Sequence, residues 1–316
     1  MEYKKNDYFY VYATNWIEMF KKNEVRKTTY QKYEVNIKFI RENFPNLKNK
    51  QISRITWQKV INKYAETRTY LTVKDFHNQF KAMLRDLVHE NVIDKDPTHR
   101  IVVHSKNVHV GKDKFLSLHE CKRLLEQLNL GVDTNGKIKH PNDWSMYIAL
   151  KTGLRFSEVI ALTPSDVDFK NNVINVDKTW NYKEKQGVFS KPKSKTSTRK
   201  VPIDPTASFM IKQLIKQTNA LQGVPILHGG KTRVFNQTVN KQLKAKCQAA
   251  EIPVISFHGL RHTFASLCIA NGVSLQQTSQ WLGHSDTTIT QQVYTHITDE
   301  MNEKDMTTKN KVMVML

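Results

Sequence analysis

The sequence predicts a mainly α-helical protein with one small antiparallel β-sheet, an α+β fold in two domains. Three observations support this. The length of 316 residues suits two domains, at roughly 100–200 residues for each. Apolar residues recur at helical spacing through the first hundred residues and again from residue 117. Between residues 165 and 203, short β-prone runs are broken by Asn, Gly and Pro, which is typical of short strands.

Four helical patterns occupy the first hundred residues, and we expect them to form a small bundle in a domain spanning residues 1–102. Thr72 has the side chain of an N-cap for the fourth helix. Asp96-Pro97 should end that helix, because a residue before proline is pushed out of the helical region. The apolar positions of the four patterns are Phe9, Tyr12, Trp16, Met19 and Phe20; Tyr30, Tyr33, Ile37 and Ile40; Trp57, Val60, Ile61 and Tyr64; and Val73, Phe76, Phe80, Met83, Leu84, Leu87 and Val88.

A change of character marks the end of the first domain. Residues 103–113 have no helical period and carry several basic groups, so we interpret them as an extended interdomain linker. Residues 114–300 then form the second domain, and residues 301–316 a C-terminal tail. The second domain opens with a helix at Ser117, where Glu120 completes a capping box.

The sheet belongs to the second domain. A helix through Trp144 and Leu150 precedes it, and Gly153 suits the C-terminal cap of that helix. The segment KPKSKTSTRK (191–200) holds five basic residues and joins two of the β-prone runs. We therefore expect an antiparallel sheet with a basic hairpin, and helices again from Ala207. The β-prone runs contain Val173, Ile174 and Val176; Val188 and Phe189; and Val201 and Ile203.

The composition indicates a polyanionic partner. The chain has 49 Lys and Arg against 29 Asp and Glu, a formal charge of +20, and such a field attracts nucleic acid. A basic protein that binds no nucleic acid is the alternative. No apolar run approaches the roughly 20 residues that span a bilayer, and the N-terminus lacks the apolar core of a signal peptide. We expect a cytoplasmic bacterial protein, associated with the nucleoid when bound to DNA.

The cysteines predict neither disulfides nor a metal site. Cys121, Cys247 and Cys268 are odd in number and widely separated, which fits a reducing cytosol and offers no metal-ligand spacing. We therefore expect no metal and no cofactor.

Basic side chains give candidate contacts with DNA phosphates. On the first domain a solvated face is the alternative, since charged runs usually serve only solubility. The candidates are Lys27 and Lys32 in the first domain and Lys191, Lys193 and Arg199 in the basic segment.

The most informative residues lie in the C-terminal sixty positions. His258 and Arg261 in HGLRHTFAS (258–266) are three residues apart, which places them on one face of a helix. A following helix ends at Gly283, so His284 lies in a turn, and Tyr294 follows about two turns into the next helix. Arg155 comes just after the Gly153 turn, where a loop would let it reach the same site.

These residue types suit cleavage of a phosphodiester by transesterification. Arg155 and Arg261 can hold two non-bridging oxygens bidentately and stabilise the charge that develops in the transition state. Tyr294, with an ordinary pKa of about 10, needs His258 or the field of the arginines to lose its proton. A lysine of the basic segment can protonate the leaving 5′-oxygen; we choose Lys195, with Lys193 as the second candidate. His284 would hydrogen-bond a non-bridging oxygen.

Each of these features has an ordinary structural interpretation when taken alone. An HxxR pair is usually a surface pair, LGH is usually the end of a helix, and a tyrosine such as Tyr294 is often half buried in a core. Their order and spacing, together with TGLR a hundred residues upstream, favour one active site.

The chain resembles the tyrosine recombinases of the phage and conjugative-element integrase family. TGLRFSEVIAL (152–162), HGLRHTFAS, LGHS (282–285) and VYTHI (293–297) resemble the family's catalytic segments, from about Phe115 to Asn302. The N-terminal bundle resembles the core-binding domain. The resemblance implies a C-shaped clamp around duplex DNA, a homotetrameric synapse, and Glu158 as support for the first arginine. It implies six active-site residues, which are Arg155, Lys195, His258, Arg261, His284 and Tyr294.

From this resemblance we expect a site-specific recombinase that integrates and excises a mobile element through a covalent 3′-phosphotyrosine. Its partners would be double-stranded attachment or core sites, an excisionase and a DNA-bending host protein. Many integrases carry an arm-binding domain before the core-binding domain, and this sequence shows no room for one. We expect the apolar end of the tail, KVMVML (311–316), to dock on a neighbouring protomer.

Three alternatives remain at this point. A chromosome-dimer resolvase shares the fold and the chemistry. A type IB topoisomerase would act as a monomer, but the motif spacing suits it poorly. A DNA-binding regulator could keep the fold and lack catalysis, although all six candidate residues are present.

Overall fold

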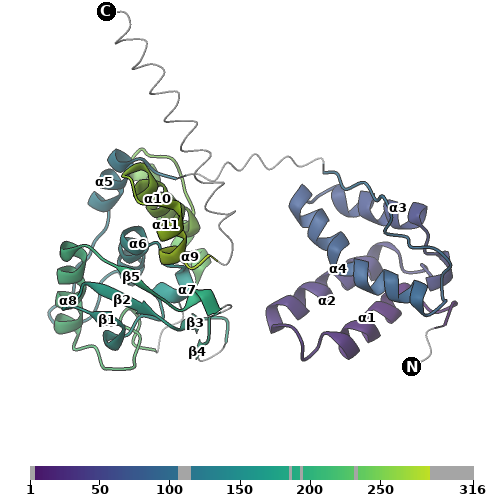
Figure 1. Ribbon diagram of the computed structural model, residues 1–316, viewed down its shortest axis with the longest axis horizontal. Helices are drawn as coiled ribbons and strands as arrows, with labels where there is room; N and C mark the ends of the chain where they lie inside the picture. Colours follow the sequence, from purple (N-terminus) through teal and green to yellow (C-terminus); the bar gives the residue numbers. More distant parts are fainter. Residues whose placement is uncertain (1–3, 106–114, 185–186, 193–194, 231–233, 285–316) are drawn as a thin grey trace, which may run out of the picture. The chain divides into compact units, whose positions relative to one another are not determined.

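The computed structural model describes residues 4–105, 115–184, 187–192, 195–230 and 234–284. Contacts within the chain divide it into two compact units, residues 1–111 and 112–316. Each unit is described by itself, and Figure 1 labels the elements of both.

The first unit is a bundle of four α-helices around an aromatic core. The Trp57 and Phe76 rings stack 6.0 Å apart, and Phe76 also lies against Tyr64, with 3.9 Å between the ring centroids. Trp57 also donates its indole N–H to Nδ1 of the buried His77, at 3.1 Å. The four predicted helical patterns are therefore confirmed. They form α1 (Phe9–Phe20), α2 (Lys27–Asn43), α3 (Arg54–Ala65) and α4 (Tyr70–His89), with a 3-10 turn η1 (Asn49–Gln51) before α3.

Both predicted ends of α4 were wrong. The N-cap is Thr69, and Thr72 lies in the first turn with its hydroxyl 2.9 Å from that of Thr69. The helix ends at His89, well before the proline, because Asn91 adopts a left-handed conformation with φ of 52°. The N–H of Val92 then donates to the carbonyl of Leu87 at 2.9 Å, which closes the helix end as a Schellman motif.

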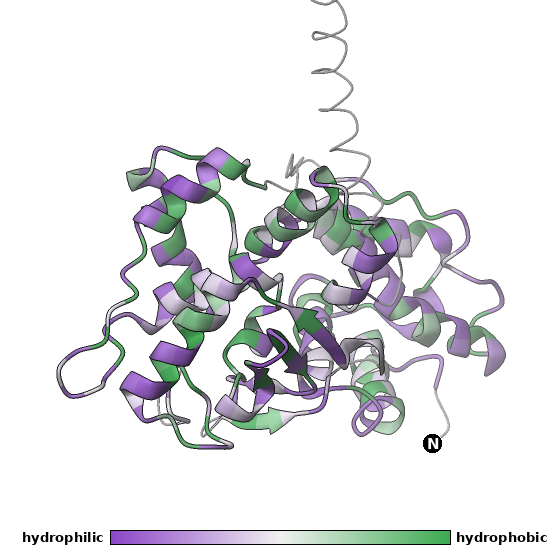
Figure 2. Ribbon diagram, turned by 60° about the vertical axis from the view of Figure 1, so that its left-hand side comes forward, coloured by the Kyte–Doolittle hydropathy of each residue, from purple (hydrophilic) through white to green (hydrophobic). Residues whose placement is uncertain are grey.

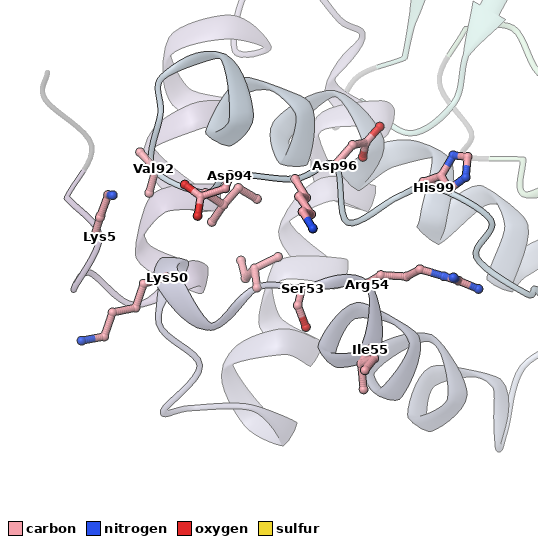
Figure 3. A pocket seen from close by; sticks show the side chains of 12 residues that line it. Lys5, Lys50, Ser53, Arg54, Ile55, Val92, Asp94, Asp96 and His99 are labelled. Atoms are coloured by element: carbon pink, nitrogen blue, oxygen red, sulfur yellow. The ribbon is translucent and has the colours of Figure 1, made fainter.

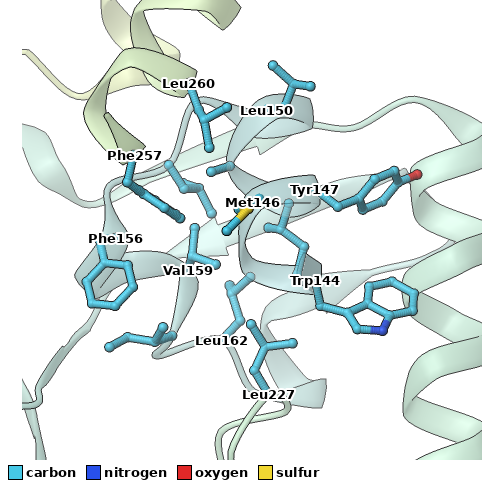
Figure 4. Packing of buried hydrophobic residues seen from close by; sticks show 14 of the residues in the cluster. Trp144, Met146, Tyr147, Leu150, Phe156, Val159, Leu162, Leu227, Phe257 and Leu260 are labelled. Carbon is cyan, nitrogen blue, oxygen red and sulfur yellow. The ribbon is translucent and has the colours of Figure 1, made fainter. Parts of the chain in front are cut away.

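The second unit surrounds a buried helix. Nine of the twelve residues of α6 (Pro141–Thr152) are buried, and α6 packs against α10 (Phe257–Ala270). Figure 4 shows Met146 of α6 in the core near Val159 and Leu260. Around these helices lie α5 (Leu118–Glu126), α7 (Phe156–Val159), α8 (Pro205–Thr218), α9 (Asn236–Ala249) and α11 (Leu275–Leu282).

Local end signals of this unit behave as predicted. The Ser117 hydroxyl accepts from the Glu120 N–H, and the Glu120 carboxylate accepts from the Ser117 N–H at 2.7 Å, a complete capping box. Gly153 ends α6 with φ of 65°, in the left-handed region that a side chain disfavours. Figure 2 shows hydrophilic and hydrophobic residues alternating along the helices, as the amphipathic patterns predicted.

Within the described ranges, the strands form two small antiparallel sheets rather than one. The first has the order β1 (Val167–Asp168), β2 (Val173–Val176) and β5 (Arg199–Pro202). The second is a hairpin of β3 (Thr179–Asn181) and β4 (Val188–Ser190).

The predicted basic hairpin was therefore wrong. The segment 191–200 does not turn between paired strands but runs from β4 in one sheet to β5 in the other, and it includes the 3-10 turn η3 (Lys195–Ser197). Burial of apolar side chains explains why β5 pairs with β2 and not with β4. Val201 of β5 pairs with Ile174 of β2 in the core, where both are fully buried, whereas Val188 and Phe189 of β4 are exposed.

Candidate active site

Two arginines brace the C-terminal ends of two helices. Gly153 ends α6 and Gly283 ends α11, each with a left-handed backbone. Arg261 of α10 donates to the carbonyl of Gly153 at 2.8 Å and to that of Leu282 at 2.6 Å. Arg155 donates to the carbonyl of Gly283 at 2.8 Å. Helix C-termini carry partial negative charge, so each guanidinium is held by favourable electrostatics as well as by hydrogen bonds.

A buried carboxylate orients the first arginine. Arg155 is the N-cap of α7, and its side chain meets Glu158 at 2.9 Å while its N–H donates to the same carboxylate at 2.8 Å. Burial of Glu158 favours the protonated form, but hydrogen bonds and charge from Arg199, followed by those from Arg155, outweigh burial and hold the pKa of Glu158 below its ordinary value. The carboxylate is therefore ionised at neutral pH.

Arg261 is the most buried cation of the site, with 1 % of its surface exposed. Burial, and then the charge of Arg155, lowers its pKa well below the ordinary value for arginine. Its Nε is buried and has no hydrogen-bond partner in the described part of the chain. Arg155 and Arg199 both pair with Glu158, and Arg261 adds a third guanidinium beside them. This excess of positive charge favours an anionic ligand.

Two histidines complete the cluster of residues that the sequence predicted. His258 lies in the first turn of α10, with its ring 4.5 Å from that of His262. His284 directly follows Gly283, and burial, together with the charges of Arg261 and Arg155, lowers its pKa to about 3. His284 is therefore neutral at physiological pH and can donate a hydrogen bond without adding charge.

A cavity of about 210 Å³ opens onto this cluster. Arg155, Arg261 and His258, three of the predicted site residues, line it. Tyr182, just after β3, also lines it, and the sequence analysis missed this residue. The signal was present, because Tyr182 lies two residues after the buried Trp180 and so continues the inward face of the strand. The other lining residues are Leu154, Phe156, Ser157, Asn236 and Phe257.

Several other predicted site residues lie outside the described residues or on the first unit, which is described by itself. Tyr294 and Lys193 lie outside the described residues, and only the backbone of Lys195 is described, at the start of η3. Lys27 and Lys32 are exposed on the first unit, and Lys191 is exposed on the second.

Arg199, which the sequence predicted as a DNA contact, is largely buried in the described structure. Its side chain is 6 % exposed and faces Glu158, 2.8 Å away, rather than solvent. The sequence could not show this, because the basic segment was taken for an exposed hairpin, whereas Arg199 begins the strand β5 that pairs with β2.

A second cavity, of about 900 Å³, lies in the first unit (Figure 3). It lies beside the start of α3 and the chain after α4, and its described lining residues all belong to the first unit. The larger of these two cavities is therefore not the candidate active site. Its charged lining residues are Lys5, Lys50, Arg54, Lys95, Asp94 and Asp96, and His99 also lines it.

The described residues also bear on two other expectations. Among them, no cluster of three or more His, Cys, Asp or Glu side chains could hold a metal ion. No helix in the described ranges is long and apolar enough to cross a membrane.

Comparison with family models decides the classification. The model described as the phage integrase family matches residues 114–301, more than half of the chain, and that of the phage integrase N-terminal SAM-like domain matches residues 8–65. The chain belongs to the phage integrase family. Among similar integrase-family proteins, a tyrosine recombinase XerC-like protein of Caldanaerobacter subterraneus subsp. tengcongensis is 26% identical over 92% of this chain and 79% of its own length. The ICEBs1 integrase of Bacillus subtilis is 25% identical over 84% of this chain and 73% of its own.

Solved structures of integrases share the fold. The Tn1549 transposon integrase in complex with transposon right end DNA superposes with a TM-score of 0.75 at 18% identity, over 95% of this chain and 98% of that one. A lambda integrase tetramer bound to a Holliday junction gives 0.66 at 15% identity, over 91% and 77%. With its sequence relatives named as recombinases, integrases and transposon transposases, this integrase-family chain is a tyrosine recombinase that cleaves and rejoins DNA.

Proposed function

We propose that this chain integrates and excises a mobile element by cutting and rejoining duplex DNA through a 3′-phosphotyrosine at Tyr294. The observation that supports this most strongly is the convergence of Arg155, Arg261 and His258 on one cavity, with positive charge in excess of the single buried carboxylate. Such an arrangement suits a phosphodiester, whose transition state gains negative charge.

Each residue has a chemical role in this proposal. Arg155 and Arg261 bind the non-bridging oxygens, and the neutral His284 donates a further hydrogen bond. The Tyr294 oxygen forms a bond to phosphorus while the bond from phosphorus to the 5′-oxygen breaks. His258 accepts the phenol proton, and Lys195 gives a proton to the leaving oxygen. The reverse sequence rejoins the strand, so the bond energy is conserved in the intermediate.

The partners follow from the same proposal. The substrate is a pair of double-stranded core sites held by a homotetramer, with an excisionase and a DNA-bending host protein setting the direction. Residues 1–102 bind the core site, residues 103–113 link the domains, and residues 114–300 carry the chemistry. Lys27, Lys32, Lys191 and Lys193 contact phosphates, and the tail 301–316 docks on a neighbouring protomer. The protein acts in the bacterial cytoplasm, at the nucleoid.

A chromosome-dimer resolvase is the second candidate. It is favoured by relatives named XerC-like and XerD, the second of which is 29% identical over 76% of this chain. Gene neighbourhood separates the two candidates. An adjacent small excision protein and flanking attachment repeats favour the integrase, and their absence favours the resolvase.

A nicked suicide substrate carrying the attachment core tests the chemistry. We expect a denaturation-resistant protein–DNA adduct from the wild type and none from Tyr294→Phe, with DNA binding retained by both. Tyr182→Phe is the matched control, because that tyrosine lines the cavity and yet has no nucleophilic role in the proposal. An adduct from Tyr294→Phe, or none from the wild type on a verified cognate site with any required partner present, would overturn it.

A further inference from the structure

The guanidinium of Arg199 uses each of its nitrogens in the described structure. Nε donates to the carbonyl of Trp281. Nη1 donates to the carbonyl of Ser197 at 2.9 Å and to Glu158 Oε1 at 3.1 Å, and Nη2 donates to Glu158 Oε2 at 2.8 Å. Only 6% of the side-chain surface is exposed to solvent, so we infer the role of Arg199 from these contacts within the protein.

These contacts join three segments of the proposed active site. Glu158 holds Arg155 directly, at 2.9 Å. Trp281 is in the last turn of α11, three residues before His284. Ser197 closes the 3-10 turn η3 that begins at Lys195. Arg199 of β5 thus contacts segments next to three candidate catalytic residues. These residues are Arg155, His284 and Lys195.

The chain makes room for this approach at Gly283. A Cβ at this position would lie 3.0 Å from both Cδ and Nη1 of Arg199 and 3.1 Å from the carbonyl of Thr196. Gly283 also has a φ of 64°, so both its backbone and its lack of a side chain are required where Arg199 passes.

We propose that Arg199 is a positioning residue, which fixes Arg155, His284 and the start of the Lys195 turn relative to one another without touching DNA. This inference rests on the proposed function, because it assigns Arg199 a role in that reaction. The geometry requires arginine. Its planar fork reaches both Glu158 oxygens and the Trp281 carbonyl at once, whereas the lysine ammonium is a single point of charge.

The test compares Arg199→Lys with Arg123→Lys on the nicked suicide substrate. Arg123 is the matched control, because its 3.0 Å ion pair is with the exposed Glu251 and neither residue lines the site cavity. Single-turnover cleavage rate, affinity for the core DNA and thermal melting are measured for both variants and the wild type. We expect Arg199→Lys to cleave about a hundredfold more slowly, since a small displacement of reacting groups has an effect of this size. Its DNA affinity should stay within about twofold of the wild type, and Arg123→Lys should match the wild type in rate.

A pH profile separates positioning from a general loss of structure. The charged groups that face Glu158 are Arg155, Arg199 and Arg261. In Arg199→Met the largest partner is gone, burial dominates, and the pKa of Glu158 should rise. The cleavage rate of Arg199→Met should therefore begin to fall at a higher pH than that of the wild type as the solution is acidified, because protonated Glu158 no longer holds Arg155 by an ion pair.

Each outcome decides the inference. Wild-type cleavage with a rate for Arg199→Lys within about twofold overturns it and leaves the proposed function intact. Parallel loss of cleavage, DNA affinity and melting temperature in both Arg199 variants, with an unchanged pH profile, also overturns it, because that pattern indicates only a structural role. A wild type that forms no adduct overturns the proposed function itself, and the inference with it.

Discussion

The two units of the chain differ in how deeply their ion pairs are buried. In the helical unit, ion pairs lie at the surface; Lys38 and Glu42, for example, are 63% and 55% exposed. In the second unit, Arg199 and Glu158 are 6% and 1% exposed. Exposed pairs contribute little to stability, and buried pairs are costly to desolvate unless every group has a partner. Asp143 and Asp166 of the second unit are also buried carboxylates, each paired with a lysine. The difference teaches that, among the residues that the structure describes, only the second unit buries its paired charges, and that the candidate site is marked by several arginines gathered around one such carboxylate, Glu158.

The largest expected effect follows from replacing Arg261. Arg261→Met should slow cleavage of the suicide substrate by about a thousandfold or more, because a buried donor aimed at a developing charge has an effect of this size. Binding of core DNA should change far less, and this is measured on the same protein by mobility shift. A cleavage rate within about tenfold of the wild-type rate would show that Arg261 has only a structural role. The contrast between the two units would then say nothing about function.

Glu158→Gln tests the buried carboxylate. The change leaves Arg155 and Arg199 without their shared counter-charge, and removing one partner of a buried pair should lower the free energy of unfolding at pH 7.5 by about 3 kcal/mol. Urea unfolding monitored by circular dichroism measures this. A loss below about 1 kcal/mol would indicate that the pair behaves like an exposed one.

The same variant predicts a pH dependence with a definite sign. The folded pKa of Glu158 is lowered, so its ionised form stabilises the fold above the ordinary glutamate pKa, and that contribution is lost as the pH falls through the lowered value. The difference in unfolding free energy between wild type and Glu158→Gln should therefore be constant near neutrality and shrink below about pH 4.5. A difference that grows on acidification would contradict the assignment.

A smaller effect is expected at the helix end that Arg261 braces. In Gly153→Ala, the new Cβ would lie 2.5 Å from the Phe264 ring at a φ of 65°, so packing and backbone strain add together, and the unfolding free energy should fall by about 3 kcal/mol or less. Gly272→Ala is the matched control, with a φ of 86° and nothing within 4 Å of the added carbon. Its free energy of unfolding should fall only by the cost of backbone strain, about 1–2 kcal/mol. Equal losses would show that the Gly153 site has space to relax.

The smallest effect is expected in the helical unit. Lys63→Ala removes a 2.8 Å pair with Glu66 in which both side chains are about half exposed. The free energy of unfolding should change by less than about 0.5 kcal/mol, and added salt should not alter the difference much. A loss above about 1 kcal/mol would mean that the first unit also relies on its charges.

Local signals were predictable from the sequence, and long-range pairings were not. Ser117 with Glu120, and the glycines that end α6 and α11, act through neighbouring backbone groups, so their residue types alone are informative. The buried contacts of Arg199 were not predicted, because its partners, Glu158 and Trp281, are 41 and 82 residues away in the sequence. The fold class, the helix face shared by His258 and Arg261, and the turn at Gly283 could thus be predicted from the sequence. The partners of a charge become known only when the strand pairing is known.

The position of the covalent bond tests the central claim most directly. The wild-type adduct is trapped on a suicide substrate, digested with nuclease and protease, and mapped by mass spectrometry. The account predicts one modified peptide, with the nucleotide phosphate on Tyr294. A phosphate on Tyr182, or on any residue other than Tyr294, would contradict it.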